Sequence, residues 1–166
     1  MPKEDYPLAP LLAVRHFREE NAKRAVRTAE AALVEASDRL RQCQEELNSY
    51  RAWLPEEEDR RYLAIMGKPM TLSQLDAFKA GLGKLRDGEL SREQAVFSAQ
   101  AEREKKVLER DAASAAAAKA QKETAKIAAH KDIWLAEYKK EAERQEEKEL
   151  EDFKPISFFG AEGEDS

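Results

Sequence analysis

The distribution of proline and glycine constrains this chain more than any other feature. Two long windows, residues 11–54 and 89–154, contain neither residue. Both are rich in alanine, glutamate, lysine, arginine and leucine, which strongly favour the helical state. A helix rises about 1.5 Å per residue, so the second window alone would extend about 100 Å if it were helical throughout. A globular domain of 166 residues cannot enclose such a rod, which argues against a Rossmann domain, a sandwich or a barrel.

The first window carries the heptad pattern of a coiled-coil seam. One row spaced by seven consists of Leu33, Leu40, Leu47 and Leu54, and a second consists of Ala29, Ala36, Cys43 and Tyr50. The steps between the two rows alternate between four and three residues, as such a seam requires. We therefore predict a first helical arm over about residues 8–66, with a kink or a new helix start at Pro55, which three glutamates follow.

The middle of the sequence predicts a turn. Gly67-Lys68-Pro69 ends the first arm, and Thr71 with Gln74 matches a capping box. We expect a short helix or loop over about 67–88, ended by Asp87-Gly88, and a second arm over about 89–152. Two registers describe the seam of this arm, the first with Phe97, Ala101, Leu108 and Ala115 and the second with Ala120, Ile127 and Trp134.

These elements predict an all-α fold, a long antiparallel two-helix coiled-coil hairpin that forms a single domain over residues 1–152. Two helices joined by a turn near the middle must run antiparallel if their apolar stripes are to be buried. Between the two registers, the alanine-rich stretch 112–129 is either a thin, tightly packed part of the hairpin or a locally weak one. A flexible tail is expected over 153–166, where Phe153, Phe158 and Phe159 either form a docking motif or fold back.

Charge and reactive residues exclude several functions. The net charge is −5 with both signs interspersed, whereas a nucleic-acid binder usually carries a basic stripe. Two histidines and one cysteine cannot supply a metal set of the His/Cys type, and no phosphate-binding loop is present. We therefore expect no catalytic residue, no metal and no cofactor. The single cysteine and the lack of a long apolar run favour a cytoplasmic protein that does not insert into a membrane.

The hairpin brings the two ends of the chain together, and there we place the candidate partner-binding residues. They are Tyr6, Leu8, Leu11 and Arg15 from the first arm and His130, Trp134, Tyr138 and Arg144 from the second. His130 and Trp134 lie four residues apart and so share one helix face. They either pack against the first arm or form a partner-facing patch. The charged run that contains Arg144, residues 141–152, is either a solvated helix end or an electrostatic docking surface.

Both ends also resemble a known family. The segment Tyr6-Pro7-Leu8-Ala9-Pro10-Leu11-Leu12-Ala13-Val14-Arg15 is similar to the opening of the YscO/SctO proteins of type III secretion systems. The segment His130-Lys131-Asp132-Ile133-Trp134-Leu135-Ala136-Glu137, continued by residues 141–149, is similar to their C-terminal arm. The flagellar counterpart of this family is FliJ. The sequence departs from the family pattern at Pro55, in its alanine-rich second arm and in its phenylalanine-containing tail.

The resemblance implies a central stalk in the cytoplasm, peripheral to the inner-membrane secretion apparatus. It implies that the chain binds and regulates the hexameric export ATPase and also contacts the export gate and secretion chaperones. Two alternatives from other classes stay open, a coiled-coil scaffold or tether and a prefoldin-like holdase chaperone, neither of which has an ATPase partner. No nucleic acid is expected among the partners.

Overall fold

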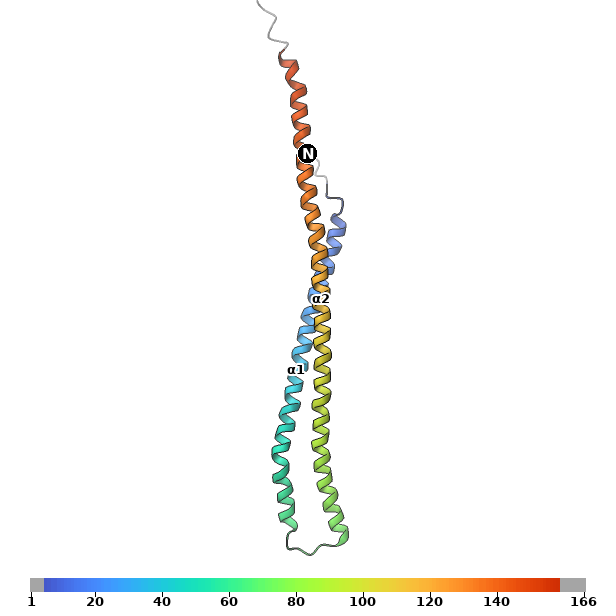
Figure 1. Ribbon diagram of the computed structural model, residues 1–166, viewed down its shortest axis with the longest axis vertical. Helices are drawn as coiled ribbons and strands as arrows, with labels where there is room; N and C mark the ends of the chain where they lie inside the picture. Colours follow the sequence, from blue (N-terminus) through green and yellow to red (C-terminus); the bar gives the residue numbers. More distant parts are fainter. Residues whose placement is uncertain (1–4, 159–166) are drawn as a thin grey trace, which may run out of the picture. The chain divides into compact units, whose positions relative to one another are not determined.

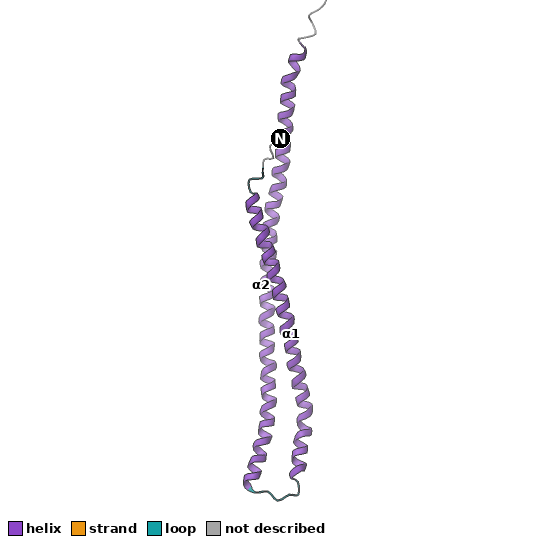
Figure 2. Ribbon diagram, turned by 180° about the vertical axis from the view of Figure 1, so that it is seen from behind, coloured by secondary structure: helices purple, strands orange, loops and turns teal. Residues whose placement is uncertain are grey.

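The structure, a computed structural model, describes residues 5–158 of the chain, with side chains described for residues 5–153. Within this part it contains two helices and no strand: α1 (Ala9–Ile65) and α2 (Leu72–Phe158), joined by a loop (Figures 1 and 2). The two helices run antiparallel and pack against each other, as the ring contact between Tyr62 and Phe78 on either side of the loop illustrates. The predicted all-α two-helix hairpin is therefore confirmed.

The chain divides into two compact units, each of which contains a segment of both helices. The terminal unit comprises Met1–Ala22 and Ala116–Ser166, and the hairpin unit comprises Lys23–Ala115. Each unit therefore has its own helix–helix contact, and each can be described by itself.

The seam predicted for the first arm is confirmed. Leu47 and Leu54 are 7% and 8% exposed, Ala36 is also buried, and the other members of the two rows are half-buried. On α2 the buried apolar side chains of the same unit are Leu85 and Ala99, which are 9% and 4% exposed. Because two helices bury only a narrow stripe on each other, few large side chains are needed to form this core.

The seam of α2 is where the predicted register is wrong in its first half. Phe97 and Leu108 are 76% and 70% exposed, and Ala101 and Ala115 are exposed as well. The residues that face α1 recur every seven positions and are all buried or half-buried: Leu85, Arg92, Ala99, Lys106, Ala113, Ala120, Ile127 and Trp134. The second predicted register, with Ala120, Ile127 and Trp134, belongs to this row and is correct.

Polar residues in the seam explain the error. Arg92 and Lys106 occupy seam positions in the hairpin unit, where long basic side chains lay their methylene stems along the partner helix and keep the charged head in water. The charged group then pairs with a neighbouring residue: the Lys106 ammonium lies 3.1 Å from a Glu109 carboxylate oxygen. A count of apolar residues alone therefore selected the wrong stripe of α2.

The loop between the helices follows the predicted signals. After α1 ends at Ile65, Gly67 adopts a φ of 75°, a left-handed conformation that glycine reaches without strain. The Lys68 amide donates to the Ile65 carbonyl over 3.2 Å. The capping box is confirmed, since the Gln74 amide donates to Thr71 Oγ1 over 3.2 Å and the Thr71 amide donates to Gln74 Oε1 over 3.1 Å.

Both helices are more continuous than the positions of proline and glycine suggested. Pro55 lies inside α1 without ending it, and α2 passes through Gly81, Gly83 and Gly88. The expected short helix over 67–88 is therefore the first part of α2, and only the loop at 66–71 turns the chain. At the other end α2 continues past the predicted boundary at 152 to Phe158. Residues 159–166 of the expected tail lie outside the described residues.

Ion pairs link the two helices of the hairpin unit. The Arg51 guanidinium donates to Glu89 over 3.1 Å and also to Glu93, and the hydrogen bond to Glu93, followed by that to Glu89, raises the pKa of Arg51. Farther along the two helices, Arg103 donates a hydrogen bond to the Ser37 hydroxyl over 3.1 Å. These contacts join residues whose numbers add up to about 140, and so they fix one register between α1 and α2.

Candidate partner-binding surface

Tyr6 anchors the start of the chain to α2 in the terminal unit. Its side chain is 5% exposed and lies edge-on to the Trp134 ring, with the two centroids 5.5 Å apart. A hydrogen bond of 2.5 Å joins the Tyr6 hydroxyl to His130 Nδ1. The Tyr6 carbonyl accepts a hydrogen bond from the Ala9 amide, so the same residue also starts the first turn of α1. In this structure Tyr6 therefore packs against α2.

Trp134 lies between two aromatic neighbours. The first neighbour is Tyr6, described above. The second is Tyr138, one turn farther along α2, whose ring stacks on Trp134 with centroids 5.4 Å apart and an interplanar angle of 14°. Trp134 and Tyr138 are half-buried, whereas His130 is exposed. The Trp134 side chain therefore packs against the first arm, and part of its surface faces solvent. We call Tyr6, His130, Trp134 and Tyr138 the aromatic cluster.

Arg15 connects α1 to α2 about two turns beyond the cluster. Its Nη1 donates to Glu123 Oε2 over 2.6 Å, and both side chains are only partly exposed. Thr124, which is 5% exposed, donates to the Arg15 carbonyl over 3.3 Å and to the Ala120 carbonyl over 3.0 Å. The Arg15 Nε is buried without a hydrogen-bond partner. Arg15 is therefore held in place by α2, and much of its charge is neutralised there.

Leu8 and Leu11 are exposed, unlike Tyr6, Trp134 and Arg15. Each is 39% exposed, and Val14 on the same segment is 45% exposed. On α2 the exposed apolar side chains of this unit include Ile133 and Leu135. The terminal unit thus combines a packed aromatic cluster with exposed aliphatic side chains from both helices.

Arg144 is not part of this cluster. It lies on α2 beyond Tyr138, where its guanidinium is exposed and 3.8 Å from a Glu141 carboxylate oxygen on the same helix. Of the eight predicted site residues, the structure brings Tyr6, His130, Trp134 and Tyr138 together and places Arg15 in an interhelical ion pair. Leu8 and Leu11 are exposed near the start of α1.

Sequence reasoning missed two groups of residues. Glu123 and Thr124, which hold Arg15, gave no signal because acidic residues on such a helix usually face solvent. A second aromatic group, Tyr50 and Trp53 of the hairpin unit, has ring centroids 5.4 Å apart. The signal for this group was available, since Tyr50 ends one row of the heptad and Trp53 lies next to the last leucine of the other.

The described residues hold no group of three or more His, Cys, Asp or Glu side chains able to bind a metal. No helix in residues 5–158 has a stretch long and apolar enough to cross a membrane. The fold and the aromatic cluster thus define a helical-hairpin protein whose interhelical sites are built from ring contacts and ion pairs.

The family follows from a comparison with protein-family models. Residues 8–155 match the model of the type III secretion protein YscO. The chain therefore belongs to the YscO family of type III secretion proteins, and the resemblance noted at its two ends is confirmed. A comparison with curated protein sequences gives no match.

Two solved structures share the fold. YscO from Vibrio parahaemolyticus is 24% identical and has a TM-score of 0.81, with 88% of this chain and 92% of that chain covered. A structure described as that of a YscO homologue, CT670 from Chlamydia trachomatis, is also 24% identical and has a TM-score of 0.73, with 92% and 94% covered. At this identity the likeness concerns the fold.

Proposed function

We propose that the chain is a cytoplasmic stalk of a type III secretion system that binds and regulates the hexameric export ATPase through its terminal unit. The family assignment places the chain in type III secretion. The observation that supports the finer assignment is the aromatic cluster, which ties the start of α1 to α2 and leaves Trp134 half-buried in a unit where Leu8 and Leu11 are exposed. Tryptophan is enriched at the centres of protein interfaces.

The proposed role has a physical basis in symmetry. A single chain of two helices has no sixfold axis, so it cannot contact six identical ATPase subunits equally. It must bind some subunits better than others, and such a difference in affinity is what shifts a conformational equilibrium. The chain would thus change the turnover of the ATPase without hydrolysing ATP itself. Contacts with the export gate and with secretion chaperones, at the inner-membrane apparatus, are part of the same proposal.

The test is to measure ATP turnover of the purified hexamer with and without the chain. We expect the chain to raise turnover or to promote hexamer assembly at micromolar concentrations. The variant Trp134→Ala should weaken binding by roughly 2 kcal/mol, about 30-fold in Kd. Phe97→Ala is the matched control, because Phe97 is a 76% exposed aromatic residue of the hairpin unit. If turnover and assembly do not respond to the wild-type chain, the scaffold interpretation is favoured.

One observation favours the holdase as a second candidate function. Around the loop of the hairpin unit, Leu63, Met66 and Leu72 are 68%, 71% and 81% exposed. Holdases of the prefoldin type bind unfolded chains through apolar coil tips. A holdase would suppress aggregation of a thermally unfolding reporter protein, and the double variant Leu63→Ser/Leu72→Ser would lose that effect. The stalk proposal predicts no suppression by either protein.

A further inference from the structure

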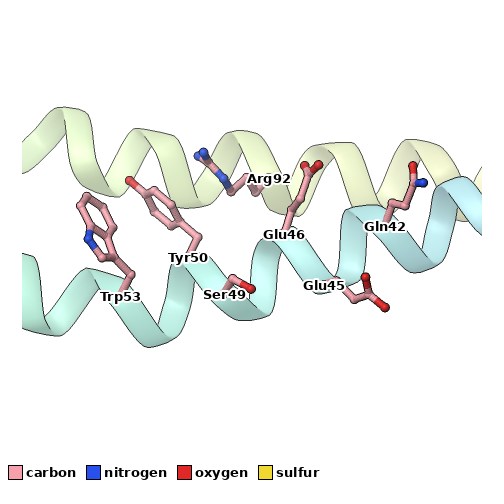
Figure 3. Close-up of a pocket in the computed structure, with 7 residues that line it drawn as sticks. All are labelled: Gln42, Glu45, Glu46, Ser49, Tyr50, Trp53 and Arg92. Atoms are coloured by element: carbon pink, nitrogen blue, oxygen red, sulfur yellow. The ribbon is translucent and has the colours of Figure 1, made fainter.

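A groove follows one side of α1 in the hairpin unit. Its first hollow has a volume of about 460 Å³ and is lined by residues from Gln42 to Trp53 together with Arg92 (Figure 3). A second hollow, of about 430 Å³, extends from Ala31 to Gln42. Gln42 lines both, so the two hollows lie next to each other along α1. We call this surface, from Ala31 to Trp53, the α1 groove.

The aromatic end of the α1 groove is held in place from α2. The Tyr50 hydroxyl donates to the Leu85 carbonyl, and the Arg92 guanidinium lies 4.0 Å from the centre of the Tyr50 ring. Figure 3 shows the rings of Trp53 and Tyr50 next to each other, with Arg92 beyond Tyr50. Arg92 also donates to the Gly88 carbonyl over 3.0 Å. Trp53 is 39% exposed on this fixed support, which suits an anchor for a partner.

The floor of the groove follows one face of α1. Its lining includes Val34, Asp38, Gln42, Glu45, Ser49 and Trp53. These positions are separated by four, four, three, four and four residues, which places them on one face of α1, along which a second helix can lie. Val34, which is 61% exposed, and Trp53 supply apolar contacts near the two ends.

Acidic side chains outnumber basic ones along the groove. Glu35, Asp38, Glu45 and Glu46 line it together with Arg39 and Arg92, and within residues 5–153 Glu35, Glu45 and Glu46 make no ion pair. The charge of Arg92 is occupied by the Tyr50 ring and the Gly88 carbonyl. An excess of carboxylates in a groove that ends at an exposed tryptophan favours a cationic ligand, because basic side chains pair with carboxylates and lie over the indole face.

We propose that the α1 groove binds a helical segment of a partner protein, one with basic residues at its centre and apolar residues toward its ends. Trp53 and Val34 receive the apolar ends, and the glutamates receive the basic centre. The site lies in the hairpin unit and goes beyond the proposed ATPase contact of the terminal unit, so either can fail without the other.

The test uses synthetic peptide probes. The first is an 18-residue amphipathic helix of leucine and lysine, and the second carries glutamate in place of every lysine. Trp134→Phe serves as the background, because Trp53 is then the only tryptophan of the chain. We expect the lysine peptide to change the Trp53 emission and to bind saturably, and the glutamate peptide to do neither.

Variants then locate the site by anisotropy of the labelled lysine peptide. Glu45→Gln/Glu46→Gln should weaken binding at least tenfold, whereas Glu143→Gln/Glu147→Gln, which removes the same charge from the terminal unit, should not. Trp53→Ala should weaken binding, and Phe97→Ala should not. Val34→Ser provides a second apolar variant at a 61% exposed position, where folding is not at risk.

Three results would overturn the proposal. Equal effects of the groove and control variants would mean nonspecific attraction to an acidic protein. Absence of binding by the lysine peptide would remove the site. Self-association of the chain in sedimentation that Trp53→Ala abolishes would mean that a second copy covers the groove.

Discussion

Gly88 lies where the side chain of Tyr50 passes close to α2. A Cβ atom at position 88 would lie 2.5 Å from the Tyr50 hydroxyl oxygen and 3.0 Å from its Cζ. The absence of a side chain thus lets Tyr50 reach the Leu85 carbonyl. Gly83 offers a contrast on the same helix, since a Cβ there would meet nothing within 4 Å.

This contrast predicts opposite effects for two glycine-to-alanine changes. Gly83→Ala should stabilise the chain by about 1 kcal/mol, the usual gain in helix propensity. Gly88→Ala should instead destabilise it by about 1 kcal/mol, because displacing Tyr50 costs its hydrogen bond and its contact with Arg92. Urea unfolding followed by circular dichroism measures both free energies. In a Tyr50→Ala background, Gly88→Ala should instead raise the free energy of unfolding, as Gly83→Ala does. If it lowers the free energy in that background too, the contact with Tyr50 is not the cause of the destabilisation.

Two aromatic residues near the start of the chain differ in burial and so predict different stabilities. Tyr6 is 5% exposed and Phe17 is 66% exposed. Tyr6→Ala should cost about 3 kcal/mol of unfolding free energy and release the N-terminal segment from α2. Phe17→Ala should change stability by no more than about 0.5 kcal/mol. Similar losses for the two variants would mean that Tyr6 does not anchor the terminal unit.

At the scale of elements, the first arm was predictable and part of the second was not. The two rows that begin at Leu33 and Ala29 form an unbroken heptad pattern, so the spacing alone predicted which residues of α1 form the seam. On α2 the most apolar stripe contains Phe97 and Leu108, yet α1 contacts the stripe of Arg92 and Lys106. The choice depends on the pairing between the helices, which the sequence of one helix does not contain.

A matched pair of alanines tests the register of α2. Ala99 is 4% exposed in the seam, whereas Ala101 is exposed. Ala99→Asp should cost at least about 2 kcal/mol more than Ala101→Asp, because only the first places a carboxylate between the helices. The change in helix propensity is the same in both variants, so urea unfolding isolates the burial effect. A larger loss for Ala101→Asp would restore the register with Phe97.

Pro55 shows why the boundaries of the helices were harder to predict than the helices themselves. Proline inside a helix removes a hydrogen bond and costs about 3 kcal/mol, yet α1 continues past Pro55 to Ile65. Packing on either side of Pro55, by Leu54 and by the half-buried Glu57 and Glu58, holds the segment helical. Such tertiary support is invisible to local propensity, whereas the capping box at Thr71 is local and was predicted correctly.

The capping box gives a prediction about the start of α2. Thr71→Ala removes the acceptor for the Gln74 amide and should cost about 1 kcal/mol, whereas Thr71→Ser keeps the hydroxyl and should cost much less. Hydrogen exchange at the Gln74 amide reads the effect directly. Equal exchange rates in the two variants would show that the cap does not hold this helix end.

At the scale of the whole molecule, fold and function came from different parts of the sequence. The breaker pattern and the heptads indicated a helical hairpin, but a hairpin hosts many functions. The segments around Tyr6 and Trp134 carried the family resemblance, and the same segments form the aromatic cluster. The antiparallel pairing made that cluster predictable, whereas the partners of Arg15 and the α1 groove depend on side-chain positions that periodicity does not give.

Hydrogen–deuterium exchange of the chain, alone and bound to the export ATPase hexamer, tests the central claim most directly. It compares all backbone amides in one experiment and needs no variant. The stalk proposal predicts that the ATPase slows exchange in the terminal unit, over residues 5–22 and 116–153, most strongly around Trp134. Protection confined to the loop at 66–71 and its flanks, or to the α1 groove, with unchanged exchange around Trp134, would contradict it.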